Sequence, residues 1–453
     1  MSTTFICTLN LYFILILLFP LIPNTVNAQK VTGMNNIKAL NQYLEGMVGI
    51  RGAEYAPVTE SYEMTANERD SLLIMSYLPE RVRVGDFMIS DHEVTNSEYK
   101  QFLNWVKDSI TAKTGKRDIK PGEFIYKYID QNGKPLELAV YPDTAIWVTE
   151  FPNSLNDPLL NYFHHPAYSN YPVVGLSYHQ VNAYIHWLNV RLKKFLFTNS
   201  FDKNLCSYKL PTEAEWQYAA RKPYKTGDRN RSIYPWEEPF FDTKGKYKAN
   251  FGMVMDQNNV GLKGYCNDGH CYTSPVKSYA SNYFGLYDMG GNVAEWVADP
   301  FSVNNHRKRV RKLLALNIPD EITVSSQLIS SNPLLYKKLS VKNIDSLTRE
   351  KMIDNLMTFS PDWKKVEEVV TDQFLLQRLK VEYSRAEHDF NAIALTRNPG
   401  IVKGGSWCDP PIYLISCITQ LYPQTGKSSR IGFRVAMDIK EEIWQYLDHQ
   451  KPK

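Results

Sequence analysis

Residues 284–296, which read Phe-Gly-Leu-Tyr-Asp-Met-Gly-Gly-Asn-Val-Ala-Glu-Trp, are the stretch that decides the fold of this 453-residue chain. The stretch places two carboxylates, Asp288 and Glu295, on either side of a Gly-Gly turn. The sequence before it, from Lys222 onward, is rich in Gly, Pro, Asn and Asp and holds few regular apolar runs. This composition predicts irregular backbone that is held by turns and by ions rather than by long helices.

Further toward the amino terminus, three helices share one start signal. A Ser or Thr N-cap is followed three residues later by Glu or Gln, as in the capping boxes Thr95 with Glu98, Ser177 with Gln180, and Thr212 with Glu215. Apolar stripes at helical spacing follow the first two caps. The stripes, which we assign to the core, are Tyr99, Phe102, Leu103 and Val106, then Val181, Tyr184, Ile185 and Leu188.

The overall composition is that of a globular protein. Apolar residues make up 43% of the chain and charged residues 22%, which excludes a disordered or fibrous protein. The formal net charge of +4 is spread along the chain, so nucleic acid is not expected as a partner.

The first 28 residues predict a secretory signal peptide. An apolar stretch runs from Leu11 to Ile22, and Val26 with Ala28 forms a cleavage site before Gln29. The segment contains no Lys or Arg, and retention as an uncleaved anchor is the alternative. No Cys follows the apolar stretch, so a lipid anchor on the mature amino terminus is not expected.

The remaining chain divides into an amino-terminal segment (29–46), a main domain (47–440) and a carboxy-terminal tail (441–453). Between about residues 299 and 395 the composition shifts to Lys, Leu, Ser and Glu, which indicates an insertion in the domain. Within it, Ser360-Pro361 starts a helix whose apolar positions are Trp363, Val366, Val370 and Phe374.

A series of phrases in fixed order resembles the formylglycine-generating-enzyme-like, or sulfatase-modifying-factor, domain family. Besides residues 284–296, the phrases are residues 91–99, 171–177, 209–221, 234–236, 249–251, 403–407 and 432–434. The resemblance implies a mixed, loop-rich α+β fold related to C-type lectin architecture, here with a largely helical insertion. The family contains copper-dependent oxidases as well as non-catalytic members, so the fold leaves the function open.

Within this family, the chain more closely resembles the non-catalytic gliding-motility and type IX secretion proteins called GldK and PorK in Bacteroidetes. The resemblance lies in residues 87–95 running into 105–110, in 141–144 and 161–168, and in the long insertion before Gly404. Those proteins are usually lipoproteins, whereas this chain lacks the Cys that would be acylated.

The family resemblance also implies two calcium sites. The first would consist of Asp288, Gly291, Val293 and Glu295, with carbonyl oxygens from Gly291 and Val293, and calcium prefers such oxygen ligands. The second would use the Asn250 side chain, the Phe251 carbonyl, Asp268 and the His270 carbonyl. The alternative is that these polar side chains cap turns and bind backbone amides.

The cysteines argue against copper. In catalytic members of the family, thiols lie three and eight residues beyond the Ser of the Gly-Gly-Ser phrase, and those positions here are Asp409 and Leu414. Cys408 and Cys417 are displaced from this spacing, so we predict a structural disulfide or two buried thiols, and no copper. Cys266 and Cys271 bound a short loop that a disulfide would close most easily.

Three functions follow from these observations. The leading hypothesis is a non-catalytic, calcium-stabilised component of a type IX secretion or gliding apparatus. It would be periplasmic and associated with the outer membrane through other protein subunits of the complex. The first alternative is an oxidase that converts Cys or Ser of a client protein to formylglycine. The second is a ligand-binding module with a lectin-like surface, which an exposed aromatic pocket near Trp236, Trp296 and Trp407 would favour.

Overall fold

The structure, a computed structural model, describes residues 40–55, 82–130, 133–151, 161–221, 234–236, 246–252, 269–301, 399–409 and 411–450. The predicted signal peptide, the insertion helix after Ser360, Cys266 and Asp268 lie outside these ranges. The chain splits into two compact units, residues 1–42 and 43–453, and α2 (Asn41–Leu44) crosses the boundary. No helix in the described part of the chain is long and apolar enough to span a membrane.

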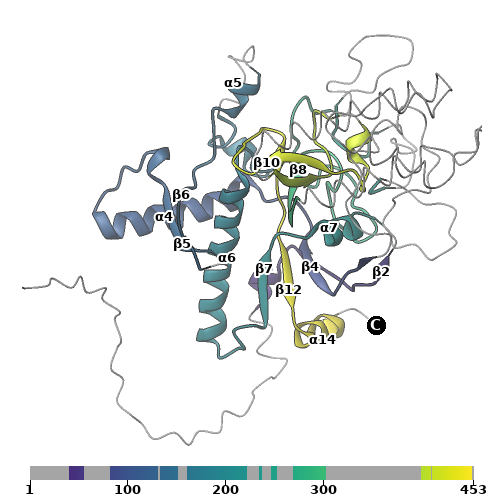
Figure 1. Cartoon of the computed structure of the whole chain (residues 1–453), viewed down its shortest axis with the longest axis horizontal. Coiled ribbons are helices and arrows are strands. Elements are labelled where there is room, and N and C mark those ends of the chain that lie inside the picture. The colour runs from purple at the N-terminus through teal and green to yellow at the C-terminus, as the bar shows by residue number, and fades with distance from the viewer. Residues whose placement is uncertain are drawn as a thin grey trace, which may run out of the picture. The chain divides into compact units, whose positions relative to one another are not determined.

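Two four-stranded sheets form the framework of the second unit (Figure 1). The first has the order β1-β4-β12-β7 and is antiparallel throughout. The second has the order β10-β9-β8-β11, with β11 parallel to β8. The strands are β1 (Met47–Ile50), β4 (Phe87–Ser90), β7 (Cys206–Lys209), β8 (Ala294–Pro300), β9 (Pro399–Lys403), β10 (Gln420–Pro423), β11 (Ile431–Gly432) and β12 (Ala436–Ile439).

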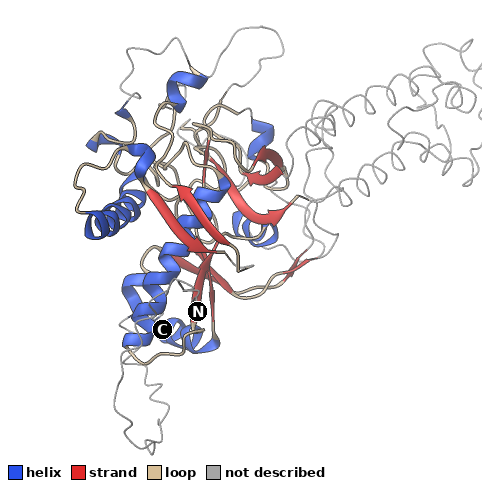
Figure 2. Ribbon diagram, turned by 60° about the vertical axis from the view of Figure 1, so that its left-hand side comes forward, coloured by secondary structure: helices blue, strands red, loops and turns tan. Residues whose placement is uncertain are grey.

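Two two-stranded sheets and helices of different lengths complete the described part, and loops make up much of it (Figure 2). The two-stranded sheets pair β2 (Glu54–Tyr55) with β3 (Val82–Arg83) and β5 (Ile125–Ile129) with β6 (Pro135–Ala139). The helices are α4 (Asn96–Thr114), α5 (Ile146–Glu150), α6 (Tyr178–Thr198), α7 (Glu213–Ala220) and α14 (Glu441–Gln450), with 3₁₀ turns η3 (Pro121–Glu123), η5 (Pro166–Tyr168) and η6 (Pro411–Leu414). The mixed, loop-rich α+β class is therefore confirmed.

All three predicted capping boxes are present. In each box the side chain of the cap residue (Thr95, Ser177 or Thr212) accepts a hydrogen bond from the backbone amide three residues on. The side chain of that third residue (Glu98, Gln180 or Glu215) accepts one from the backbone amide of the cap. The stripe of α4 is buried as predicted. In α6, however, Leu188 is only partly buried and Trp187 is buried instead.

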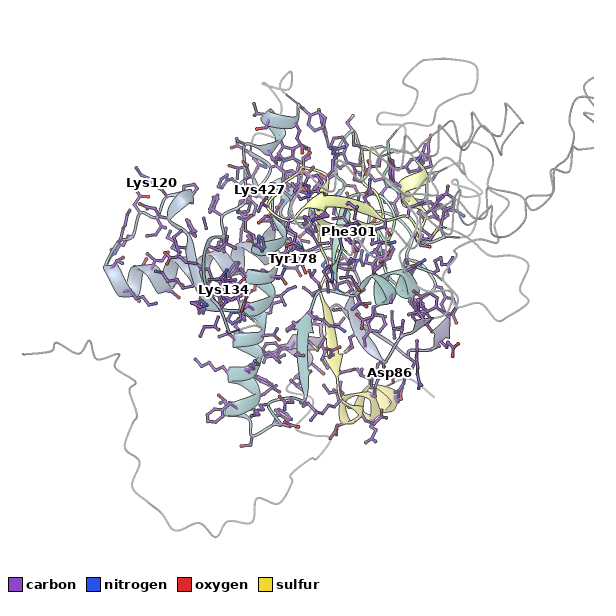
Figure 3. The ribbon with its side chains drawn as sticks, viewed as in Figure 1. Asp86, Lys120, Lys134, Tyr178, Phe301 and Lys427 are labelled. Atoms are coloured by element: carbon purple, nitrogen blue, oxygen red, sulfur yellow. The ribbon has the colours of Figure 1, made fainter. Side chains whose placement is uncertain are left out.

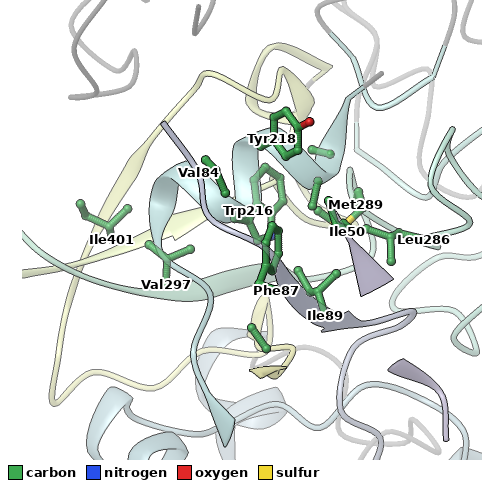
Figure 4. Packing of buried hydrophobic residues seen from close by; sticks show 13 residues of the cluster. Ile50, Val84, Phe87, Ile89, Trp216, Tyr218, Leu286, Met289, Val297 and Ile401 are labelled. Atoms are coloured by element: carbon green, nitrogen blue, oxygen red, sulfur yellow. The ribbon is translucent and has the colours of Figure 1, made fainter. Parts of the chain in front are cut away.

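The core that joins the two sheets surrounds Trp216 of α7, whose side chain is fully buried (Figure 4). Phe87 and Ile89 reach this cluster from β4, while Val297 and Ile401 reach it from β8 and β9. The Tyr178 hydroxyl donates to the Ala298 carbonyl (3.2 Å), which ties the start of α6 to β8; Figure 3 labels Tyr178.

Two boundaries differ from the sequence analysis. Asp299, given as the start of the insertion, still belongs to β8, and β9 begins only at Pro399. Residues 441–450, which were set apart as a tail, form α14, with Ile443, Trp444 and Tyr446 buried.

Candidate functional site: a buried acidic cluster beside two thiol loops

The Gly-Gly turn is packed directly on the backbone of Asn250. Gly291 has φ = +86°, and a Cβ added there would lie 2.1 Å from the Asn250 carbonyl oxygen, so only glycine fits. The amide of Asn292 donates to the same oxygen (2.8 Å), and the Gly291 amide donates to the Gly404 carbonyl (2.9 Å). The turn is thus fixed between two phrases that are distant in the sequence.

Glu295, a predicted calcium ligand, forms a buried ion pair with Arg434. The Arg434 Nε donates to Oε2 (2.7 Å) and its terminal Nη2 donates to Oε1 (2.6 Å), and both side chains are at most 1% exposed. The Trp216 Nε1 also donates to Oε2 (2.7 Å). Both carboxylate oxygens of Glu295 are therefore already engaged, which the sequence analysis did not foresee.

Two further acids lie close to this pair. Glu93 is fully buried, and the Asn292 Nδ2 donates to its Oε1 (3.0 Å). Burial and the nearby Asp288 carboxylate raise the pKa of Glu93 well above its usual value. Burial also raises the pKa of Asp288 to about 6, although the Lys277 amide donates to its Oδ2 (2.7 Å).

The formal charges of this cluster do not balance, which favours either protonation of a carboxyl group or a bound cation. Three buried carboxylates, those of Glu93, Asp288 and Glu295, share one buried guanidinium. A buried charged group needs an oppositely charged or hydrogen-bonding partner. Without one it becomes neutral by gaining or losing a proton. The Oε2 of Glu93 has no hydrogen-bond partner among the described residues. At the first site Arg434 and Trp216 already bind both oxygens of Glu295, which leaves Asp288 as the carboxylate that could hold a calcium ion there.

The second predicted site has an orphaned oxygen of its own. Asn250 is 1% exposed, and its Nδ2 donates to the Tyr272 carbonyl (2.8 Å), but its Oδ1 has no partner in the described part of the chain. An amide oxygen with no donor fits a hard cation. Phe251 is buried beside Asn250, His270 is described, and Asp268 lies outside the described residues. No cluster of three or more His, Cys, Asp or Glu side chains suited to a metal occurs within the described ranges.

The structure assigns each described cysteine a state. Cys271 is disulfide-bonded. Cys408 and Cys417 are thiols in the structure and not a disulfide, and of the two buried thiols that were the alternative only Cys417 is buried. Burial raises the pKa of the Cys206 thiol to about 12.

The two thiols pack in different surroundings. Cys417 is buried in an apolar cluster with Phe251 and Leu414, whereas Cys408 is partly exposed and packs against the cluster of Trp147 and Trp407.

Asp409 and Leu414 stand at the positions that carry thiols in catalytic relatives, and both have structural contacts here. Leu414 is fully buried. Asp409 accepts a hydrogen bond from the Ser406 hydroxyl (2.6 Å), and its carbonyl accepts from the Gly252 amide (2.9 Å). The pKa of Asp409 is raised, because the effect of burial outweighs that of the hydrogen bond from Ser406.

The three tryptophans that would have favoured ligand binding do not form one exposed pocket. Trp296 and Trp407 are 1% and 3% exposed. Trp236 stacks on Tyr234 in the cluster of Phe251, while Trp407 stacks on Trp147 in another cluster. These side chains contribute to packing.

Glu93, Asn292 and Arg434 lie in quoted phrases but were not identified as site residues. The available signal was a lone charged or amide side chain inside an apolar run, as in Phe433-Arg434-Val435. Such a residue in a buried strand requires a partner, although the sequence does not say which.

The chain matches a known domain family over most of its length. Residues 36–439 match the family described as the sulfatase-modifying factor enzyme 1-like domain. The formylglycine-generating enzyme of Thermomonospora curvata is 28% identical over 266 residues, which cover 58% of this chain and 74% of the relative. That of Mus musculus is 27% identical over 229 residues, which cover 50% and 52%.

A relative described as inactive is also similar. The inactive C-alpha-formylglycine-generating enzyme 2 of Bos taurus is 29% identical over 141 residues, or 31% of this chain and 36% of the relative. Because the family match extends over most of the sequence, the chain belongs to the sulfatase-modifying factor enzyme 1-like domain family.

Proposed function

We propose that this protein is a non-catalytic structural component of a type IX secretion or gliding-motility apparatus. It would act at the periplasmic face of the outer membrane, where other subunits of the complex would hold it. The specific support for this apparatus is the likeness of residues 87–95, 141–144 and 161–168 to the GldK and PorK proteins.

The observation that carries the non-catalytic assignment is the burial of Leu414. Copper-dependent members of the family need two thiolates on one Cu(I) ion, because soft sulfur ligands suit that metal. At one of the two positions this chain has a fully buried leucine, and at the other it has Asp409, which is hydrogen-bonded to Ser406. Neither side chain can replace a thiolate as a ligand.

The second candidate function is the formylglycine-generating oxidase, which the names of several relatives favour. It would require Cys408 and Cys417 to bind copper together. Their spacing argues against this, because Cys408 and Cys417 lie two and eleven residues beyond Ser406 instead of three and eight.

The test is a mass assay with a sulfatase-motif peptide that contains cysteine. Copper-loaded protein incubated with the peptide in oxygen should leave the peptide mass unchanged. The double variant Asp409→Cys and Leu414→Cys restores the spacing of the catalytic relatives and serves as a matched comparison. A mass loss that disappears when Cys408 or Cys417 is replaced by Ser would establish the oxidase instead. Co-purification from envelope membranes tests the structural role, and recovery of no envelope subunit would contradict it.

We also propose calcium at both sites described above, as a structural ion. Asn250 Oδ1 and the excess negative charge around Asp288 support it. An ion that binds only the folded state adds stability by mass action, so a chelator should lower the melting temperature. Metal analysis of protein purified in calcium provides the direct measurement, and a metal-free protein with an unchanged melt would refute the sites.

A further inference from the structure

The two-stranded sheet of β5 and β6 is held against α4 and α6 by one of its faces (Figure 1). On that face the Tyr126 ring packs edge-on against Phe102, with 5.2 Å between the ring centres. The Tyr126 hydroxyl also forms a hydrogen bond with His186 Nδ1 (2.8 Å). On the opposite face the side chains of Lys127 and Ile129 are exposed, Ile129 to 62%. The sheet is thus fixed in place with one face accessible to solvent.

The outer edge of β5 presents unpaired backbone groups. The Val140 amide donates to the Phe124 carbonyl (2.9 Å), and the Asp130 amide donates to the Lys134 carbonyl (2.9 Å). Because hydrogen-bonded positions alternate along an antiparallel pair, the backbone groups of the even-numbered residues in β5 point toward β6. Those of the odd-numbered residues point away from β6 and have no hydrogen-bond partner among the described residues. The odd-numbered residues are Ile125, Lys127 and Ile129.

The outer edge of β6 is less suited to pairing. Pro135 has no backbone amide to donate, and proline is one of the residues that protect a sheet edge. The carbonyl of Ala139 already accepts a hydrogen bond from Gln180 Nε2 of α6 (3.0 Å). The two edges of the sheet therefore differ, and a further strand would pair with β5, because an edge with unpaired amides and carbonyls is a template for another strand.

The charge beside the outer edge of β5 favours an acidic partner. Lys127 stands at the middle of the strand, and its side chain is 70% exposed although it pairs with Glu137 of β6 (2.7 Å). Residues 107–127, which lead from α4 into β5, contain six Lys or Arg and three Asp or Glu. A second copy of this chain that paired antiparallel about the middle of β5 would place Lys127 opposite its own equivalent. Like charges in directly opposite positions are destabilising, whereas an acidic residue would attract Lys127.

We propose that the outer edge of β5 binds an extended segment of a partner protein as a third strand, with an acidic residue opposite Lys127 and apolar residues opposite Ile125 and Ile129. Hydrogen bonds to the backbone groups of the edge supply the affinity, and the alternating side chains select the sequence. Apolar residues fit beside the two isoleucines because an apolar side chain directly opposite covers their exposed surface. The binding of such a segment does not depend on the apparatus to which the partner belongs.

The probe is a synthetic peptide, Thr-Val-Thr-Glu-Thr-Val-Thr with blocked ends and a fluorescent label, and fluorescence anisotropy measures its binding to the full chain. The matched peptide has Lys in place of Glu. The acidic peptide should bind saturably and about threefold more tightly than the basic one, in line with the strength of cross-strand charge pairs. Lys127→Glu should reverse this preference, which a loss of folding alone would not do.

Two proline variants test the edge itself. Lys127→Pro removes the middle amide of the outer edge of β5, and Glu137→Pro removes the equivalent amide of β6. Neither amide bonds to the other strand, so thermal melts should show both variants folded. Lys127→Pro should weaken binding of the acidic peptide by about fivefold or more, as the loss of a hydrogen bond predicts, whereas Glu137→Pro should leave it unchanged.

Three results would overturn the proposal: no saturable binding of the acidic peptide, equal binding of both peptides, or equal effects of the two proline variants. If Lys127→Pro does not fold, the charge reversal with Lys127→Glu still decides the question. Analytical ultracentrifugation tests the other occupant. A dimer that becomes a monomer with Lys127→Pro or Lys127→Glu would assign the edge to a second copy of this chain, which also overturns the proposal.

Discussion

At the scale of single residues, the buried Glu295–Arg434 ion pair connects several elements of the fold. Arg434 is fully buried and also donates to the carbonyls of Ser90 (3.1 Å) and Tyr287 (2.9 Å), so it joins β4, the turn and β8. Removal of one partner of a buried pair leaves an uncompensated charge inside the protein.

We therefore expect Arg434→Met to lower the free energy of unfolding by about 3–5 kcal/mol. Chemical denaturation measures the loss. Lys127→Ala, which removes an exposed ion pair with Glu137 (2.7 Å), is the matched control and should cost at most about 1 kcal/mol. If both substitutions cost the same, Glu295 does not depend on Arg434 for its charge balance.

This pair also shows where sequence reasoning stops. The family resemblance implied the residues of the proposed calcium sites, which stay a prediction. Arg434 could not be placed beside Glu295, because 139 positions separate them and no local signal specifies a partner at that distance. The alternatives for Cys408 and Cys417 stayed open in the sequence for the same reason, since a disulfide depends on geometry that the spacing does not contain.

At the scale of secondary structure, local signals were sufficient for α4, α6 and α7. Their capping boxes are contacts within three residues, so the sequence contains both partners. Helix α14 differs, because it is held by contacts with residues that lie almost the whole domain away in the sequence. Arg51 lies 4.2 Å over the Trp444 ring and forms an ion pair with Asp448 (2.6 Å).

Trp444→Ala should therefore detach α14 and destabilise the first sheet. The ring is 3% exposed and packs so closely on Gly49 of β1 that an added Cβ would lie 2.8 Å from it. Truncation of a buried aromatic residue costs about 3–5 kcal/mol, which thermal or urea unfolding would detect.

Asp448→Ala is the control for the Trp444 variant. Its ion pair with Arg51 is 44% exposed on both sides, so the loss should be below about 1 kcal/mol. A Trp444 variant as stable as the parent protein would show that residues 441–450 are a dispensable tail after all.

At the scale of the whole molecule, the long connection between β8 and β9 is the main departure from a minimal domain. The two strands are paired, with Pro300 opposite Gly400, so the chain leaves the sheet and returns to it at neighbouring positions. Opposite residues of antiparallel strands lie about 4.5–5.5 Å apart at Cα. A short turn can therefore bridge the gap.

We predict that replacing residues 302–398 with a Gly-Ser linker of about six residues leaves the domain folded and abolishes assembly with envelope partners. Folding should survive because the Trp216 core draws on β4, α7, β8 and β9, which all remain. Shortening the connection roughly sixteenfold should also lower the entropy cost of closing it, by about 2 kcal/mol. Assembly should be lost because inserted segments commonly carry function.

The deletion is assayed by thermal melt and by co-purification from the envelope, beside the full chain prepared in the same way. Because Glu295, Asn292 and Asn250 all lie outside the deleted segment, a folded variant should also keep its calcium-dependent rise in melting temperature, which reports that the acidic cluster is intact. A variant that melts much lower in calcium would show that the segment packs on the domain and stabilises it. A folded variant that still recovers every partner would assign docking to another surface.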